Sequence, residues 1–322
     1  WTPDTSGLVG PEEVLFLVEA LAIRRREVAG TNASIAGAAF LVAAALAWGM
    51  GSGPRSGWIV PFALAAAWLA TALYESRQAR RGGKEAFAAA RQQHRHAAWV
   101  HSRPATYTWT ILFLLTAVMV AEMFGLRDAI EAAGLLKPEV RDGEFWRLLT
   151  GALLHGGLMH LAFNLLAFWS LGPLIEAHAG RAMLPIVFLY SALVGSVASL
   201  LLIPDVASVG ASGGILGLIG FLFVLGYRRR HALPANFVRR MGIGILATAV
   251  FGIVGFALVD NATHIGGLLT GMLLAGFLPT DTSDSGSVSR RSLNIVGDVA
   301  LAIIVLGAVG SIALIYRAIG AS

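Results

Sequence analysis

A series of apolar runs, each close to the length that crosses a lipid bilayer, dominates this sequence. The runs lie at 33–50, 57–74, 106–124, 150–171, 183–203, 209–227, 241–259, 262–279 and 295–316. A helix needs about 20 apolar residues to span the hydrocarbon core of a membrane. Charged residues make up only 13% of the chain, whereas soluble domains carry about a quarter. The sequence therefore predicts an all-α protein that crosses the membrane several times.

The segments between these runs divide the chain into six predicted parts. Residues 1–30 hold apolar side chains at helical spacing, which predicts an amphipathic helix on the cytosolic lipid surface. The connection at 125–148 mixes charged and apolar residues and is expected to fold on the membrane surface. The predicted parts are a cytosolic segment (1–30), a transmembrane hairpin (31–75), a basic cytosolic linker (76–104), a membrane-embedded core (105–279), a polar linker (280–294) and a last transmembrane helix (295–322).

The positive charges predict how the chain is oriented. With the N-terminus in the cytosol, 18 of the 24 Lys and Arg residues fall on the inner side, as the positive-inside rule requires. The C-terminus is then expected outside. We expect no cleavable signal peptide, because the first long apolar run follows some thirty polar or mixed residues. A composition rich in Ala, Gly and Arg favours a bacterial plasma membrane.

Composition also argues against several kinds of site. The chain has no cysteine, so disulfides and thiolate metal sites are excluded. His94, His96 and His101 lie close together in the basic linker, but no acid or cysteine completes a metal-ligand set. Topology accounts for the net charge of +5, and no segment resembles a nucleic-acid-binding module. We expect neither a metal nor a cofactor.

The stretch Val209-Gly210-Ala211-Ser212-Gly213-Gly214 opens one of the apolar runs. Its serine would stand at a helix N-terminus, which favours developing negative charge, and its glycines would let a substrate backbone approach. Small residues also promote helix packing in membranes. Taken alone, this stretch fits packing better than catalysis.

Polar residues near the start of three runs give the stretch a different meaning. The runs at 150–171, 209–227 and 262–279 all begin at the predicted outer face, and ionisable groups inside a membrane usually face a protein interior or a wet cavity. A single hydrated cavity open to the outside is therefore predicted. The polar residues are His155, His160 and Asn164 on the first run, Ser212 on the second and His264 on the third.

A serine and an imidazole are the minimum for nucleophilic catalysis, because the imidazole accepts the hydroxyl proton. His160, Asn164 and the backbone N–H of Ser212 are candidate donors to the resulting oxyanion. No acid is placed to orient His264, since Asp260 sits at the membrane edge, so we expect a dyad.

Other interpretations of these polar residues remain open. A proton pathway would also use intramembrane histidines, but the inner half of the membrane lacks a chain of Asp, Glu or Lys. A zinc site from His155, His160 and His264 lacks an HExxH motif or a carboxylate partner. His155 is as readily a structural residue as a catalytic one.

Together these residues resemble the rhomboid family of intramembrane serine proteases. Gly210-Ala211-Ser212-Gly213 is similar to the family's GxSG motif, and the resemblance covers about 105–279 in the family's order. The other matching pieces are His155 to Asn164 (HGGLMHLAFN), Ala262 to Gly267 (ATHIGG), Trp146-Arg147, Glu176 as a structural acid, and Gly267 with Gly271 as the GxxxG of the histidine helix.

The resemblance implies a fold and an activity. It implies a six-helix core with one extra C-terminal span, preceded by a hairpin to which it assigns no role. Ser212 would be the nucleophile and His264 the general base, with His160, Asn164 and the Ser212 amide as oxyanion donors and with His155 and Gly210 in support. The connection at 125–148 would be the membrane-embedded first loop and the run at 241–259 the gate.

The implied substrates are single-pass transmembrane proteins, cut near the outer side of the bilayer. We expect a preference for segments with small or helix-breaking residues there, because an intact helix hides its carbonyl groups. One position departs from the family pattern: Leu216 stands where many rhomboids have an aromatic residue against the imidazole. The imidazole must then be oriented by other contacts.

Two other classes of function are weighed against proteolysis. A rhomboid-like membrane chaperone or adaptor would bind transmembrane clients without cutting them, but such proteins usually lose the serine or the histidine. A transporter ranks third. The sequence leaves the oligomeric state open.

Overall fold

The computed structural model describes residues 84–321 with gaps at 204–205, 235, 255–258 and 278–286. The predictions for 1–30 and 31–75 concern residues outside this described part. The chain divides into two compact units, and the described residues 96–252 and 259–321 belong to the second. All of the contacts discussed below lie within this second unit.

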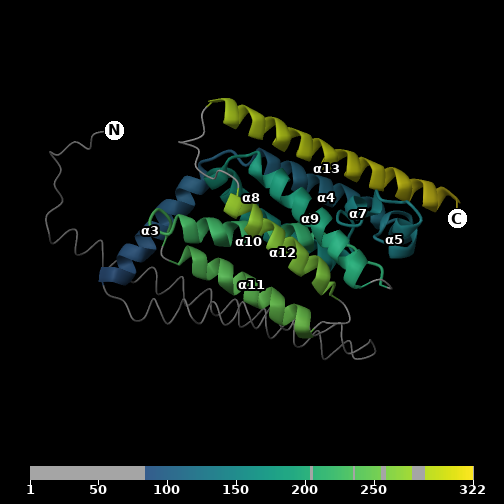
Figure 1. The fold of residues 1–322 in the computed structure, drawn as a ribbon, viewed down its shortest axis with the longest axis horizontal. Coiled ribbons are helices and arrows are strands. Elements are labelled where there is room, and N and C mark those ends of the chain that lie inside the picture. Colours follow the sequence, from purple (N-terminus) through teal and green to yellow (C-terminus); the bar gives the residue numbers. More distant parts are fainter. Residues whose placement is uncertain (1–83, 204–205, 235, 255–258, 278–286, 322) are drawn as a thin grey trace. The chain divides into compact units, whose positions relative to one another are not determined.

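The described chain is helical, and its only β pairing is an isolated bridge between Leu135 and Ser208. This confirms the predicted all-α class, while the division into a six-helix membrane core and extra spans stays a prediction. The helices, shown in Figure 1, are α3 (Lys84–His101), α4 (Thr106–Glu122), α5 (Leu126–Ala133), α6 (Lys137–Arg141), α7 (Arg147–Thr150), α8 (Leu158–Ala179), α9 (Met183–Leu202), α10 (Ser212–Arg228), α11 (Phe237–Val254), α12 (Asn261–Phe277) and α13 (Ser287–Ala321).

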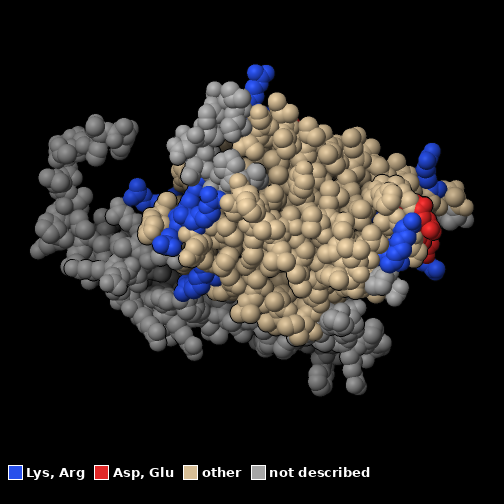
Figure 2. Space-filling model, viewed as in Figure 1, with Lys and Arg blue, Asp and Glu red and all other residues tan. Residues whose placement is uncertain are grey.

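Several of these helices suit a membrane. Within the described residues, α8, α9 and the stretch Arg291–Ala321 of α13 are long and apolar enough to span a bilayer. The end of α3 and α4 make a fourth candidate, bent by 70° between Arg95–His101 and Thr106–Glu122. Figure 2 shows charged side chains gathered at the two ends of the visible face, with a wide uncharged band between them. The protein is therefore an integral membrane protein.

The start of α8 differs from the prediction. We expected a helix from about residue 150, but α7 ends at Thr150 and α8 begins at Leu158. The intervening loop contains Gly156 and then Gly157, whose φ of 139° is incompatible with a helix. The backbone N–H of His155, in the same loop, donates to Glu122 Oε1 at 2.8 Å. The 150–171 prediction is therefore wrong at its start, and His155 lies in a loop.

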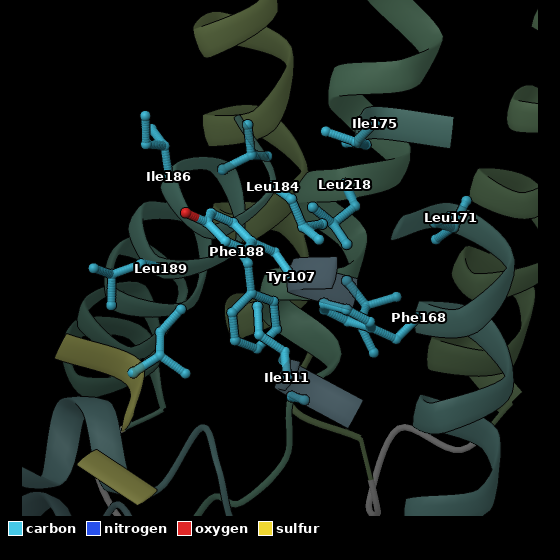
Figure 3. Close-up of a cluster of buried hydrophobic side chains, with 14 of the residues drawn as sticks. Tyr107, Ile111, Phe168, Leu171, Ile175, Leu184, Ile186, Phe188, Leu189 and Leu218 are labelled. Carbon is cyan, nitrogen blue, oxygen red and sulfur yellow. The ribbon is translucent and has the colours of Figure 1, made fainter. Parts of the chain in front are cut away.

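The buried core joins side chains from α4, α8, α9 and α10. Figure 3 shows these apolar side chains in one cluster, with Phe168 and Phe188 among them. The rings of Phe168 and Phe188 meet edge to face with their centroids 5.3 Å apart, a favoured geometry for aromatic pairs. This cluster fixes α10, and therefore its first residue, Ser212, against the rest of the bundle.

The connection between α4 and α8 folds into short helices around Arg147. The guanidinium of Arg147 donates to the carbonyl oxygens of Glu131 (3.1 Å) and Gly134 (3.0 Å), and to Glu144 Oε2 at 2.6 Å. It also lies 4.5 Å from the ring centroid of Trp146. These contacts give the Trp-Arg pair an architectural role in this structure: it holds α5 and α7 together.

The last helix is longer than predicted. It begins at Ser287, inside the predicted linker 280–294, and continues to Ala321. Polar residues can form the exposed first turns of a helix as easily as a linker, and so composition alone did not separate the two. α13 packs against α4, α5, α7 and α9.

Glu176 of α8 caps the N-terminus of α4. Its Oε1 accepts hydrogen bonds from the backbone N–H (2.7 Å) and the hydroxyl (2.6 Å) of Thr108, and its Oε2 accepts from the N–H of Tyr107 at 3.4 Å. The first N–H groups of a helix have no partner within the helix. The buried carboxyl group of Glu176 therefore joins α8 to α4.

We expect Glu176→Ala to lower the free energy of unfolding in detergent micelles by about 3 kcal/mol, because it leaves buried donors on α4 unpaired. Ser170→Ala is the matched control, since its exposed hydroxyl donates only to Leu166 O of the same helix. Denaturant titration followed by circular dichroism measures both variants. Equal stability of the two would contradict a capping role for Glu176.

Candidate active site

Ser212 and His264 come together although they are 52 residues apart in the chain. Nε2 of His264 lies 2.8 Å from Oγ of Ser212. Ser212 is the first residue of α10, and His264 lies in the first turn of α12. Both residues are half-buried, so the pair is accessible without being on the open surface. The distance and the atoms are those that proton transfer from a hydroxyl to an imidazole requires.

Glycines bring the backbones of α10 and α12 into direct contact. A Cβ atom on Gly267 would overlap the carbonyl oxygen of Gly213, and one on Gly271 would overlap that of Gly217. On α9, Gly195 similarly lies against the carbonyl group of Thr263. These contacts recur one helical turn apart, so they fix the register in which α12 presents His264.

Gly210 and His160 lie beside the serine, and Asn164 contacts the backbone of His160. Gly210 has a φ of 131°, which favours glycine, and a Cβ atom there would lie 2.7 Å from Cε1 of His160 and 3.8 Å from Ser212 Oγ. The ring of His160 therefore fills space that a side chain at 210 would occupy. The amide of Asn164, one turn further along α8, donates to His160 O at 2.9 Å. The structure thus brings Gly210 and His160 together near Ser212, and joins Asn164 to His160.

His155 approaches this group from the loop. Its ring is fully buried and meets the ring of His160 edge to face, with the centroids 5.3 Å apart. Because His155 precedes α8, the expectation that it lies on the same helical run as His160 is wrong. Neither ring nitrogen of His155 has a hydrogen-bond partner among the described residues. Burial and the neighbouring His160 lower the pKa of His155 to about 3, so its ring is neutral.

The other predicted site residues make structural contacts, and among the described residues none of them forms a side-chain hydrogen bond with Ser212 or His264. Trp146 and Arg147 belong to the connection before α8, and Glu176 caps α4. Leu216 is buried one turn after Ser212. Nδ1 of His264 has no hydrogen-bond partner within the described part of the chain, so the geometry there is that of a pair without an orienting acid. No cluster of three or more possible metal ligands occurs among the described residues.

Sequence reasoning missed a buried polar cluster beside the pair, formed by Lys137, Ser199, Ser208 and Asp260. The ammonium group of Lys137 donates to Ser208 Oγ at 2.6 Å and to Val206 O, and it lies 4.0 Å from Asp260 Oδ2. Asp260 Oδ2 also accepts hydrogen bonds from Ser208 Oγ (2.6 Å) and from Ser199 Oγ. The usable signal is the charge of Asp260, four residues before His264, although its position in the sequence predicts a place at the membrane edge.

Comparisons with known proteins point to one family. The Rhomboid domain profile matches residues 142–280, which include His155, His160, Asn164, Ser212 and His264. The putative rhomboid protease YdcA of Bacillus subtilis (strain 168) is 32% identical over 167 residues, which cover 51% of this chain and 81% of YdcA. The chain belongs to the rhomboid family.

Other relatives include active and inactive members of the family. The rhomboid protease GluP of the same organism is 37% identical over 167 residues, but the match covers only 32% of GluP. Human inactive rhomboid protein 2 is 31% identical over 169 residues, or 20% of its length. Membership of the rhomboid family therefore does not by itself decide whether a chain cleaves peptides.

Proposed function

We propose that this rhomboid is an intramembrane serine endopeptidase that uses Ser212 as nucleophile and His264 as general base. The observation that carries the proposal is the 2.8 Å approach of His264 Nε2 to Ser212 Oγ. Homology to the rhomboid proteases GluP and YdcA supports it. The half-buried position of the pair allows a substrate and water to reach it.

In the proposed mechanism, His264 Nε2 takes the proton of Ser212 Oγ while that oxygen attacks the carbonyl carbon of the scissile bond. The tetrahedral oxyanion accepts hydrogen bonds from the Ser212 amide and from the side chains of Asn164 and His160. Collapse of this intermediate breaks the C–N bond, and His264 returns the proton to the leaving nitrogen. Water, activated by His264, then cleaves the acyl ester and regenerates Ser212.

The proposed substrates are single-pass transmembrane proteins, cut near the outer side of the bilayer. The predicted orientation, with the N-terminus in the cytosol and the C-terminus outside, puts the starts of α10 and α12 at that side. Membership of the rhomboid family supports this substrate class. Bacterial relatives are consistent with a location in a bacterial plasma membrane.

The decisive experiment is cleavage of a model transmembrane substrate by the purified protein, with a fluorophosphonate probe as a second readout. We expect the wild-type protein to cleave the substrate and to be labelled at Ser212, and Ser212→Ala to do neither. Ser102→Ala is the matched control, since this exposed hydroxyl donates only to Trp99 O. Cleavage by Ser212→Ala at the wild-type rate would overturn the mechanism.

A second candidate is a chaperone or adaptor that binds transmembrane clients without cutting them. The similarity to inactive rhomboid proteins favours it. The retained serine and histidine, in hydrogen-bond contact, favour the protease. Intact clients that co-purify with a wild-type protein unreactive to the probe would decide for the adaptor.

A further inference from the structure

The cluster around Asp260 lies where three segments of the chain meet. Lys137 begins α6 in the connection before α8, Ser208 lies four residues before Ser212, and Asp260 directly precedes α12. Leu135 and Ser208 also exchange backbone hydrogen bonds of 3.0 and 3.1 Å. The connection is therefore joined both to the loop that carries Ser212 and to the turn that carries His264.

Asp260 uses its two carboxylate oxygens for different tasks. Oδ1 accepts the backbone N–H of Thr263 at 3.0 Å, which is the N-cap bond of α12. Oδ2 faces Lys137, Ser199 and Ser208. His264 follows the capped residue directly, and its own N–H donates to Asp260 O at 3.2 Å. One carboxylate thus joins the first turn of α12 to the loop that leads to α10.

Both charged partners are withdrawn from water. The side chain of Lys137 is fully buried, and that of Asp260 is 18% exposed. Burial lowers the pKa of the Lys137 ammonium, and the charge of Asp260 opposes this change. Burial alone would raise the pKa of Asp260, but hydrogen bonds from Ser199, Ser208 and Thr263 outweigh it and leave the pKa below its usual value. The ammonium group of Lys137 therefore depends on the charge of Asp260, 4.0 Å away, where little water reaches it.

We propose that Lys137 and Asp260 are a positioning pair that holds the Ser212 loop and the His264 turn in one register. Within the described part of the chain, Lys137 forms no hydrogen bond or ion pair with either residue of the dyad, and so its effect would be exerted through Ser208 and Asp260. The connection before α8 then contributes to the geometry of the dyad through this ammonium group, in addition to the backbone bridge between Leu135 and Ser208. The catalytic readout of this inference rests on the proposed function, but its structural readout does not.

The substitutions Lys137→Met and Asp260→Asn, singly and together, separate positioning from helix capping. Asparagine also caps helices well, so a capping role alone predicts that Asp260→Asn exchanges its amide hydrogens and cleaves substrate almost like the wild type. A positioning pair predicts a large change, because the buried ammonium of Lys137 loses its counter-charge. Adding Lys137→Met should then restore part of the protection from exchange and of the kcat that Asp260→Asn loses, because it removes the uncompensated positive charge.

Hydrogen exchange measured by mass spectrometry gives a readout that needs no activity. We expect Asp260→Asn to raise exchange about tenfold in two separate segments, 208–212 and 261–265, while the core of α9 stays protected. The double variant should exchange more slowly than Asp260→Asn in both segments. Arg127→Met is the matched control, since it breaks an exposed ion pair with Glu131 in the same connection, and it should leave both segments unchanged.

Kinetics with a cleavable substrate give the second readout. We expect kcat to fall about tenfold in Asp260→Asn at nearly constant KM, as misplacement of catalytic groups predicts, and to recover partly in the double variant. Three results would each overturn the inference. In the first, Asp260→Asn keeps its exchange rates and its kcat within twofold of the wild type. In the others, Lys137→Met does not relieve the losses caused by Asp260→Asn, or exchange rises throughout the chain. A wild-type protein that is folded but inactive would overturn the proposed function instead. The exchange data would still show whether Lys137 and Asp260 act as a positioning pair.

Discussion

Replacing His264 with glutamine is expected to lower kcat for a transmembrane substrate by about a thousandfold or more. A glutamine amide can still contact Ser212 Oγ but cannot accept its proton, and general base catalysis contributes about 10²–10⁴ in rate. Loss of the second function of the imidazole, protonation of the leaving nitrogen, adds to this. Labelling of Ser212 by a fluorophosphonate should fall in parallel, because the probe reports the same activated hydroxyl.

The control for this variant is His231→Gln, which changes an exposed histidine after α10. We expect it to cleave at the wild-type rate, and both variants to unfold at the same denaturant concentration as the wild type. A His264→Gln protein that retains a tenth or more of the wild-type kcat would show that another group removes the proton.

Gly271→Val is expected to lower stability and activity together. A side chain at this position of α12 would overlap the backbone of Gly217 on α10, and neither backbone can move without separating the two helices. Overpacking in a close-packed core costs about 1–3 kcal/mol. We expect a loss of about 3 kcal/mol in the free energy of unfolding, together with loss of cleavage, because separation of the helices also moves His264 away from Ser212.

Gly276→Val tests whether the loss of stability in Gly271→Val comes from the contact with Gly217. Gly276 lies on the same helix, and a Cβ atom there would meet nothing within 4 Å. We expect Gly276→Val to unfold and to cleave like the wild type, as judged by denaturant titration and by the substrate assay. A similar loss in both variants would mean that helix propensity, and not the contact with Gly217, sets the stability.

The sequence predicted most of the helices because apolar runs of membrane length have few alternatives. It failed where local chemistry overrides hydropathy. Residues 150–157 are apolar enough for a helix, but Gly157 adopts a positive φ and the His155 amide bonds to Glu122 on another helix. The segment before residue 104 was predicted as a linker from its charges, yet Lys84–His101 is helical. Hydropathy does not distinguish a polar helix from a polar linker.

Part of the candidate site could also be predicted, since Ser212, His160 and His264 each lie in a recognisable motif. The cluster of Lys137 with Asp260 could not be predicted in this way. Its members are 123 positions apart, and a single sequence gives no measure of which distant charges meet. Glu122 was visible in the sequence as an acid at the end of an apolar run. Its partner, a backbone amide, carries no residue-type signal at all.

The length of α13 lets its C-terminal end reach α5. Its apolar stretch of 31 residues measures about 46 Å at 1.5 Å per residue, whereas the hydrocarbon core of a bilayer is about 30 Å thick. At the C-terminal end of α13, Ile315 is buried with Ala121 and Ala129, and Ile319 packs against them. The C-terminal turns of α13 thus brace α5, so a truncation of only two turns would loosen a segment that lies almost 200 residues earlier in the sequence.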